Sequence, residues 1–128
     1  MFSYNQKTGE IRDSFGKLIG VGYSGKNEGK NNPDMQDIHK VGPIPCGYYT
    51  IDSERDTVHH GPYALPLIPD EANEMFGRSE FLIHGDSIEH PGMASEGCII
   101  AAKAIRVLMN TIQDHRLEDI SGVNDLIA

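Results

Sequence analysis

The sequence predicts a mainly β domain with one packed α-helix near the C-terminus. Short runs rich in β-branched and aromatic residues, separated by Gly, Asn and Pro, fill most of the first part of the chain. Residues 101–113 form the only segment of appreciable length in which apolar residues recur at helical spacing. A chain of 128 residues and 14.1 kDa is long enough to bury a substantial core. We therefore expect a single domain over residues 1–128.

Strand signals open the chain. Residues 2–5 and 10–12 flank Lys7-Thr8-Gly9 and predict a hairpin, and residues 17–23 predict a third strand. The stretch 24–42 is polar and rich in Gly and Asn, so it is expected to form a long loop.

Three further strands are expected in the middle of the chain. Residues 47–52 carry aromatic and β-branched side chains after a Pro-rich turn. Residues 63–68 predict another strand, which Pro66 would confine to a sheet edge or a bulge. The apolar run 81–83 predicts a buried strand.

The last part of the chain predicts the helix and a closing strand. Within residues 101–113 one apolar stripe at i, i+3, i+4 and i+7 is formed by Ile105, Leu108, Met109 and Ile112. Residues 115–120 are expected to return as a strand, and the tail beyond them is expected to fray.

The charge balance excludes several classes of partner. Eleven basic against nineteen acidic residues give a formal net charge of −8, which disfavours nucleic acids and anionic membrane surfaces. No apolar run approaches the ~20 residues of a membrane helix, so no membrane insertion is expected. The start of the sequence lacks the regions of a signal peptide, which predicts synthesis in the cytoplasm. Of the two cysteines, Cys46 is expected to be a small half-buried residue.

The chemistry-bearing pair stands at the two ends of a glycine-marked loop. His84 follows the predicted strand 81–83, and Cys98 precedes the apolar pair Ile99-Ile100. A thiol with its ordinary pKa, near about 8.5, is only a few per cent ionised at neutral pH and needs a base. The pattern predicts Cys98 as a nucleophile and His84 as its base.

These residues also carry a resemblance to a known family. His84-Gly85, a loop, and then Ser95-Glu96-Gly97-Cys98-Ile99 resemble the motif of the L,D-transpeptidase catalytic domain, whose thiol enzymes remodel peptidoglycan. Further blocks resemble the small branch of type VI secretion L,D-transpeptidase effectors; they are Gly22-Tyr23-Ser24-Gly25, Asn31-Asn32-Pro33, Gly42-Pro43-Ile44-Pro45, His60-Gly61-Pro62-Tyr63 and Met75-Phe76-Gly77-Arg78.

The resemblance covers roughly residues 2–120 and carries implications beyond the residues themselves. It implies a β-rich fold, peptidoglycan stem peptides as substrate, and delivery by a secretion system to the periplasm of a target cell. An immunity protein is a candidate partner, and no cofactor is expected.

The base must be held in one orientation. The resemblance implies that the backbone carbonyl of Gly85 holds the second ring nitrogen of His84. Asp86 is a competing orienter, or else an acid that caps the loop.

The nucleophile's turn supplies the other catalytic candidates. Backbone N–H groups of Gly97 and Cys98 are the expected donors to a tetrahedral oxyanion. Ser95 is expected either to hydrogen-bond within the turn or to assist the substrate. Two positions depart from the broad family motif: Glu96 precedes Gly97, and Ile100 stands two residues after the thiol. A Glu96 carboxylate near the sulfur would oppose its ionisation.

A second set of polar residues is expected to bind the stem peptide and its carboxylate. It comprises Tyr23, Asn31, Asn32, Arg78 and Asp86. A turn before Pro33 explains the two asparagines equally well. A structural ion pair would explain Arg78.

Two alternatives to thiol catalysis remain open. His59, His60, His84, Asp86 and His90 offer zinc ligands for a metallopeptidase, although no H-x-x-x-H or H-E-x-x-H spacing occurs. A non-catalytic module that binds the wall or a partner is the other alternative.

The favoured reaction begins with attack of Cys98 on the third residue of a tetrapeptide stem, which expels the terminal D-alanine and leaves a thioester. Water as acceptor gives L,D-carboxypeptidase activity, a D-amino acid gives exchange, and a second stem gives a cross-link. The resemblance favours the first two outcomes.

Overall fold

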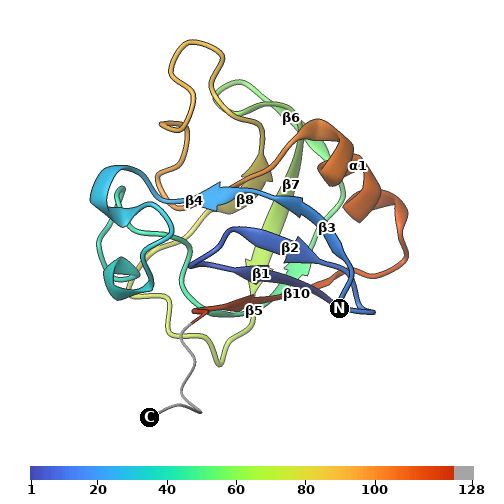
Figure 1. Ribbon diagram of the computed structural model, residues 1–128, viewed down its shortest axis with the longest axis horizontal. Coiled ribbons are helices and arrows are strands. Elements are labelled where there is room, and N and C mark those ends of the chain that lie inside the picture. Colours follow the sequence, from blue (N-terminus) through green and yellow to red (C-terminus); the bar gives the residue numbers. More distant parts are fainter. Residues whose placement is uncertain (123–128) are drawn as a thin grey trace.

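A ten-stranded sheet dominates the computed structural model, which describes residues 1–122 (Figure 1). Most of the tail that is predicted to fray, residues 123–128, lies outside the described residues. The strands are β1 (Phe2–Asn5), β2 (Glu10–Arg12), β3 (Leu18–Val21), β4 (Tyr23–Ser24), β5 (Gly47–Ile51), β6 (Arg55–Thr57), β7 (Gly61–Pro69), β8 (Phe81–His84), β9 (Ile99–Ile100) and β10 (Arg116–Ile120).

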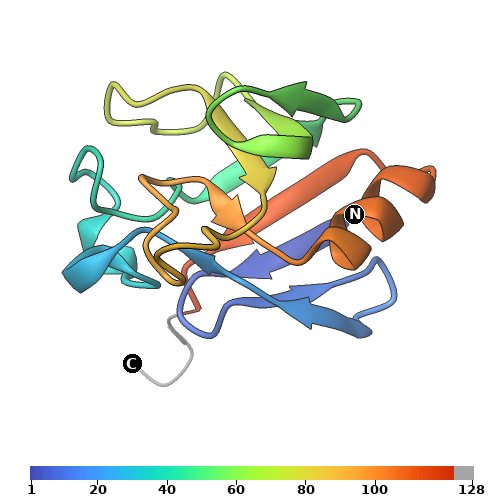
Figure 2. The same ribbon diagram turned by 90° about the horizontal axis from the view of Figure 1, so that it is seen from above.

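The sheet curves until it is nearly closed. Its strand order is β3-β2-β1-β10-β5-β7-β8-β9-β4, and β6 pairs with β7 off this path. The strands at the two ends of the order, β3 and β4, are neighbours in the sequence, which brings those ends together (Figure 2). One helix, α1 (Lys103–Thr111), packs on the sheet near the C-terminus. The predicted fold class is confirmed.

The N-terminal predictions are confirmed except at one glycine. β1 and β2 pair as the predicted hairpin. The third strand divides into β3 and β4 at Gly22, where a Cβ would lie 2.1 Å from the carbonyl oxygen of Ile100. Only glycine permits this close passage of the backbone. The predicted loop 24–42 contains two short 3₁₀ helices, η1 (Asn27–Gly29) and η2 (Pro33–Met35).

The prediction for Pro66 is wrong, because β7 lies inside the sheet between β5 and β8. Pro66 pairs with Leu82 of β8 within that ladder. On the other side its carbonyl accepts the N–H of Asp52 at 2.9 Å, just beyond the end of β5. The missing proline N–H therefore falls where the β5 partner leaves the ladder, and one lost hydrogen bond is tolerated there.

The helix is confirmed, but its predicted apolar stripe is only partly buried. Met109 is buried, whereas Leu108 and Ile112 are 40% and 38% exposed. Arg106 is buried instead, and its guanidinium donates to the carbonyls of Ala101, Pro62 and Tyr63. These three hydrogen bonds turn the face of α1 that carries Arg106 toward the sheet.

Strands from both ends of the described chain meet in the middle of the sheet. β10 pairs in parallel with β1 and antiparallel with β5. The strongly buried side chains of these strands include Phe2, Tyr4, Tyr49 and Leu117. β6 is polar and has no counterpart among the predicted strands. Among residues 1–122, no helix has the length and apolar character needed to cross a bilayer.

Candidate active site

Two adjacent parallel strands deliver the predicted dyad. β8 and β9 pair with Ile83 opposite Ile99 and His84 opposite Ile100. Cys98 directly precedes β9, and its Sγ accepts the N–H of Leu82 at 3.3 Å. Because side chains alternate along a strand, this register places Cys98 and His84 on the same face. Both residues line one cleft.

His84 is buried and oriented. Its side chain is 2% exposed, and its Nδ1 lies 2.9 Å from the carbonyl oxygen of Gly85. The other ring nitrogen, Nε2, is buried without a hydrogen-bond partner among residues 1–122. A proton on Nδ1 satisfies the Gly85 carbonyl and leaves Nε2 as a free acceptor. This is the geometry predicted for a general base that is held by a backbone carbonyl.

The surroundings favour neutral forms of both groups. Burial lowers the pKa of His84 to about 4; the Gly85 carbonyl opposes this shift, while His60 and Arg106 add to it. Burial raises the pKa of the Cys98 thiol to about 11; the Leu82 N–H opposes this, and the Glu96 carboxylate adds to it. At neutral pH the cleft therefore holds a neutral thiol and an uncharged imidazole.

The cleft is large and rich in histidine. Its volume is about 1310 Å³, and five of the six histidines line it: His39, His59, His60, His84 and His90.

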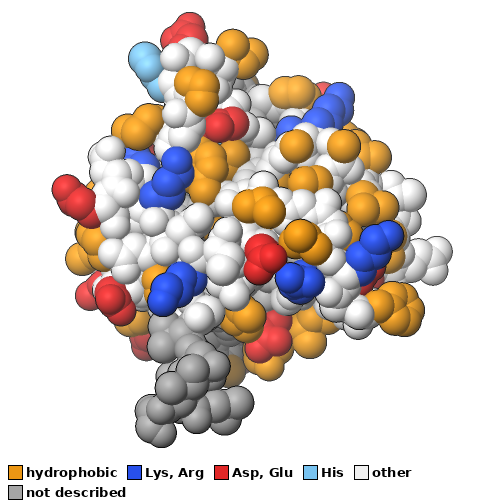
Figure 3. All heavy atoms as spheres, in the orientation of Figure 1, with side chains coloured by type: hydrophobic (Ala, Val, Ile, Leu, Met, Phe, Trp, Pro, Cys, Tyr) orange, Lys and Arg blue, Asp and Glu red, His pale blue; other side chains and the backbone are white. Residues whose placement is uncertain are grey.

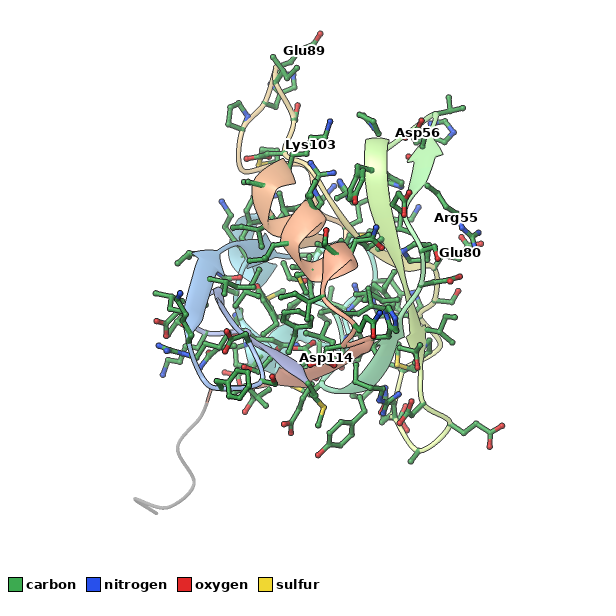
Figure 4. All side chains as sticks on the ribbon, turned by 90° about the vertical axis from the view of Figure 1, so that its right-hand side faces the viewer. Arg55, Asp56, Glu80, Glu89, Lys103 and Asp114 are labelled. Atoms are coloured by element: carbon green, nitrogen blue, oxygen red, sulfur yellow. The ribbon has the colours of Figure 1, made fainter. Side chains whose placement is uncertain are left out.

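Two projections rise from the body, namely the loop between β8 and β9 and the β6–β7 hairpin. In Figure 4 they are marked by Glu89 and Asp56. On the face shown in Figure 3, basic and acidic side chains are scattered among apolar ones rather than gathered into one patch.

The chain also matches a known protein family. A family model described as the Tlde1 domain matches residues 20–123. The chain belongs to the Tlde1 domain family. This is a type VI secretion effector family of the L,D-transpeptidase type, so the implied branch is confirmed. Searches of curated proteins and of solved structures found no match.

Ser95 of this Tlde1 domain holds the turn before Cys98. It is fully buried, and its Oγ accepts N–H groups from Gly25 at 2.8 Å and Gly97 at 3.1 Å while donating to the carbonyl of Cys98. One donor and two acceptor positions are the whole capacity of a hydroxyl. Of its two predicted roles, the structural one fits this arrangement. The same bonds engage the Gly97 N–H, one of the two predicted oxyanion donors.

Arg78 lies in the wall of the cleft but is occupied by the backbone. It is 7% exposed and donates to four carbonyls, those of Gln36, Gly42, Pro43 and Glu96. The predicted ion pair is absent among the described residues, and a guanidinium saturated in this way has little left to offer a substrate. Arg78 instead ties the loop 24–42 to the turn before Cys98.

Tyr23 and Asp86 brace the loop between β8 and β9. The Tyr23 hydroxyl donates to Asp86 at 2.6 Å and accepts the N–H of Ala94 at 3.0 Å. Asp86 also accepts the N–H groups of Ser87 and Gly92. The loop-capping alternative for Asp86 is therefore the one that fits, and the Gly85 carbonyl rather than Asp86 contacts His84 Nδ1.

The two asparagines have structural partners away from the cleft. Asn31 Oδ1 accepts the Tyr4 hydroxyl at 2.9 Å and the Ser24 N–H at 3.0 Å. Asn32 caps η2 by accepting the N–H of Asp34. In the part of the chain that the structure describes, neither asparagine lines the cleft, and Tyr23 does not either. The turn alternative explains Asn32, whereas Asn31 links the loop to Tyr4 and Ser24.

Two residues near the base were not predicted in these positions. His60 places its ring against that of His84, and Arg106 approaches Gly85 from α1. In the sequence, His60 stands in a block that resembles the effector branch and among the zinc candidates, but no spacing rule joins it to His84. Arg106 carries a signal of its own, a cation next in sequence to Ile105 of the apolar stripe.

The zinc alternative lacks a ligand set in this arrangement. Within residues 1–122, no three His, Cys, Asp or Glu side chains converge as a metal site requires.

Proposed function

We propose that this Tlde1 domain is a cysteine enzyme that removes the terminal D-alanine from peptidoglycan tetrapeptide stems, or exchanges it for another D-amino acid. One observation carries the proposal. His84 has Nδ1 held by the Gly85 carbonyl and Nε2 buried and unpartnered, in the cleft that also exposes Cys98. Buried polar atoms without a partner are rare in proteins, and a free ring nitrogen in the same cleft as a thiol has a use for its lone pair once the thiol must lose its proton.

The first half-reaction forms a thioester. Cys98 Sγ attacks the carbonyl carbon of the third stem residue while its proton passes to His84 Nε2. The resulting imidazolium returns that proton to the departing D-alanine amine, and the C–N bond breaks. The N–H of Cys98 is the first oxyanion donor in this proposal. The Gly97 N–H serves only once it leaves Ser95 Oγ.

The second half-reaction regenerates the thiol. Water or the amine of a D-amino acid gives a proton to His84 and attacks the thioester carbonyl, after which the C–S bond breaks and Cys98 regains the proton. Water yields the shortened stem, and the amine yields an exchanged stem. Hydrolysis removes tetrapeptide donors from the wall, and exchange leaves tetrapeptides whose fourth residue is no longer D-alanine. Family membership supports delivery to the periplasm of a target cell and an immunity protein as partner.

Digestion of purified peptidoglycan tests the proposal. The wild-type protein should shorten or exchange tetrapeptide muropeptides, as read by mass, and Cys98→Ala should abolish this without lowering the melting temperature. Cys46→Ala is the matched control, because Cys46 is also a free cysteine and lies outside the cleft lining among residues 1–122. Iodoacetamide should inactivate the protein and EDTA should not. Turnover by Cys98→Ala, or loss with EDTA that zinc restores, would overturn covalent thiol catalysis.

A further inference from the structure

The rings of two histidines lie together at the cleft. The centroids of His60 and His84 are 4.5 Å apart, with 35° between their planes. His84 is 2% exposed, whereas His60 lies on the exposed turn before β7. One ring of the pair is therefore open to solvent protons, and the other is sheltered. The reaction proposed above gives His60 no role.

The turn that carries His60 is anchored on both sides. The His60 N–H donates to Thr57 Oγ1 at 2.9 Å, and Thr57 Oγ1 donates to the carbonyl of Gly61 at 3.2 Å. Beyond the turn, the carbonyl of Pro62 accepts from the Arg106 guanidinium at 2.9 Å. Arg106 belongs to α1, so the helix and the hairpin together fix the His60 backbone beside the base. The ring contact is part of the fold.

We infer that His60 is a positioning residue that gates the base: its neutral ring supports His84 during proton transfer from Cys98, and its charged ring blocks that transfer. The inference rests on the proposed function, since it concerns the proton that Cys98 must give up. His60 acts through His84, without contacting the scissile bond.

The charges that face His84 single out His60 as the variable one. The Arg106 cation on α1 and the Asp86 carboxylate on the β8–β9 loop act on His84 in opposite directions, and both keep their charge at neutral pH. His60, from the β6–β7 turn, is the third group that acts on the ring. Histidine is the side chain whose charge changes between about pH 5 and 8.

The effect of that charge follows from electrostatics. Proton transfer turns His84 into an imidazolium. A second cation with its ring centroid 4.5 Å away raises the free energy of that state, because like charges repel. A neutral aromatic ring at the same place attracts the cation instead. A charged His60 ring should therefore slow proton transfer from Cys98 to His84, and a neutral ring should not.

Four variants test the gate. His60→Phe keeps a flat ring without a charge, and His60→Arg supplies a permanent charge. The same two substitutions at His115, which is exposed and outside the cleft lining among residues 1–122, serve as controls. We would measure kcat and KM for D-alanine release from a disaccharide tetrapeptide between pH 4 and 9. The pH at which the His84 ring C–H resonance titrates is measured in parallel by NMR.

The expected results distinguish an effect of the His60 charge on proton transfer from a purely structural role of its ring. In His60→Phe the acid fall of kcat should move to lower pH, and His84 should titrate at a higher pH than in the wild type. In His60→Arg kcat should fall on the order of tenfold wherever the wild-type His60 ring is neutral and should approach the wild-type value where that ring is charged, with KM little changed. Superimposed pH profiles, or an unchanged His84 titration in His60→Phe, would overturn the gate. If the wild type releases no D-alanine at any pH, the proposed function fails, while the NMR comparison still decides whether the two rings are coupled.

Discussion

Cys98 and His84 are both held in their uncharged forms, so the thiol should be unreactive until a substrate arrives. Burial raises the pKa of Cys98 to about 11, and the pKa of His84 is lowered to about 4. The free protein should react with iodoacetamide slowly at neutral pH, and the rate should climb toward about pH 11. Stopped alkylation followed by mass spectrometry measures this profile. A plateau reached near pH 8 would instead reveal an ordinary thiol.

Glu96, which departs from the broad family motif, allows a second test of the pH profile of Cys98 alkylation. The Glu96 carboxylate is one of the groups that raise the pKa of Cys98, after burial. Glu96→Gln should therefore shift the alkylation profile to lower pH, because removing a nearby negative charge favours the thiolate. Glu89→Gln, at the tip of the β8–β9 loop in Figure 4, is the matched control and should leave the profile in place. Equal profiles for all three proteins would mean that Glu96 does not reach the sulfur.

Gly97 is required by both its backbone and its surroundings. Its φ is +134°, and an added Cβ would lie 2.5 Å from Arg78 Nη2 and 2.7 Å from Phe81 Cε1. Gly97→Ala should therefore cost several kcal/mol of unfolding free energy and remove activity, since the turn before Cys98 must shift. Gly16→Ala is the control, because Gly16 has φ +79° but nothing within 4 Å of its added Cβ. It should cost only about 1–2 kcal/mol in chemical denaturation.

At the scale of elements, local pattern predicts strands and helix well and their placement poorly. The hairpin β1–β2, the strand β10 and the helix α1 all follow from composition and spacing. The position of β7 between β5 and β8 does not, because the cost of Pro66 depends on where the neighbouring strand ends. The buried face of α1 was misjudged for a similar reason. Arg106 finds carbonyl partners that are distant in sequence.

Arg106 supplies the prediction at this scale. Arg106→Met would leave the carbonyls of Pro62 and Tyr63 without their donor, at about 1–3 kcal/mol for each buried group that finds no water. Thermal unfolding should show a clear loss of stability, and α1 should loosen from β7. Lys103→Met, on the exposed side of the same helix, should change the melting temperature little. Equal stability of the two variants would show that apolar packing alone holds the helix.

At the scale of the whole molecule, the placement of His84 and Cys98 at the two ends of one loop was predictable, and the contacts around them were not. His84 and Cys98 are marked by glycines and by the family pattern, and their register needs only one pair of adjacent strands. The ring contact between His60 and His84 and the hydrogen bonds from Arg78 to backbone carbonyls join residues from elements that are far apart in the sequence. Such contacts depend on the closure of the sheet, which no local signal reveals.

The closed sheet also buries an acid that the chemistry does not use. Asp119 is 2% exposed, and its Oδ2 accepts from Gln6 Nε2 at 2.9 Å. Its other oxygen, Oδ1, and the Gln6 Oε1 have no hydrogen-bond partner among residues 1–122. Burial raises the pKa of Asp119 well above its ordinary value, against the opposing Gln6 hydrogen bond. Protonation of the Asp119 carboxyl turns its Oδ1 into a hydrogen-bond donor, so the protonated form of Asp119 suits this buried site.

This burial predicts how stability depends on pH. Because the pKa of Asp119 is raised in the folded protein, its contribution is complete below the ordinary aspartate value near about 4 and is lost as the pH rises toward the folded value. Asp119→Asn keeps a neutral group of the same shape and cannot ionise. Above about pH 4, the unfolding free energy of Asp119→Asn should rise relative to that of the wild type by up to ~1.4 kcal/mol for each pH unit, until the folded pKa of Asp119 is reached. Urea denaturation measures this difference. Asp70→Asn should behave oppositely, because hydrogen bonds with Arg116 lower the pKa of Asp70: its stability deficit should be complete above about pH 4 and should shrink as the pH falls below that value. A constant difference between Asp119→Asn and the wild type across pH would mean that Asp119 is ionised in the fold, and the sheet would then enclose a charge.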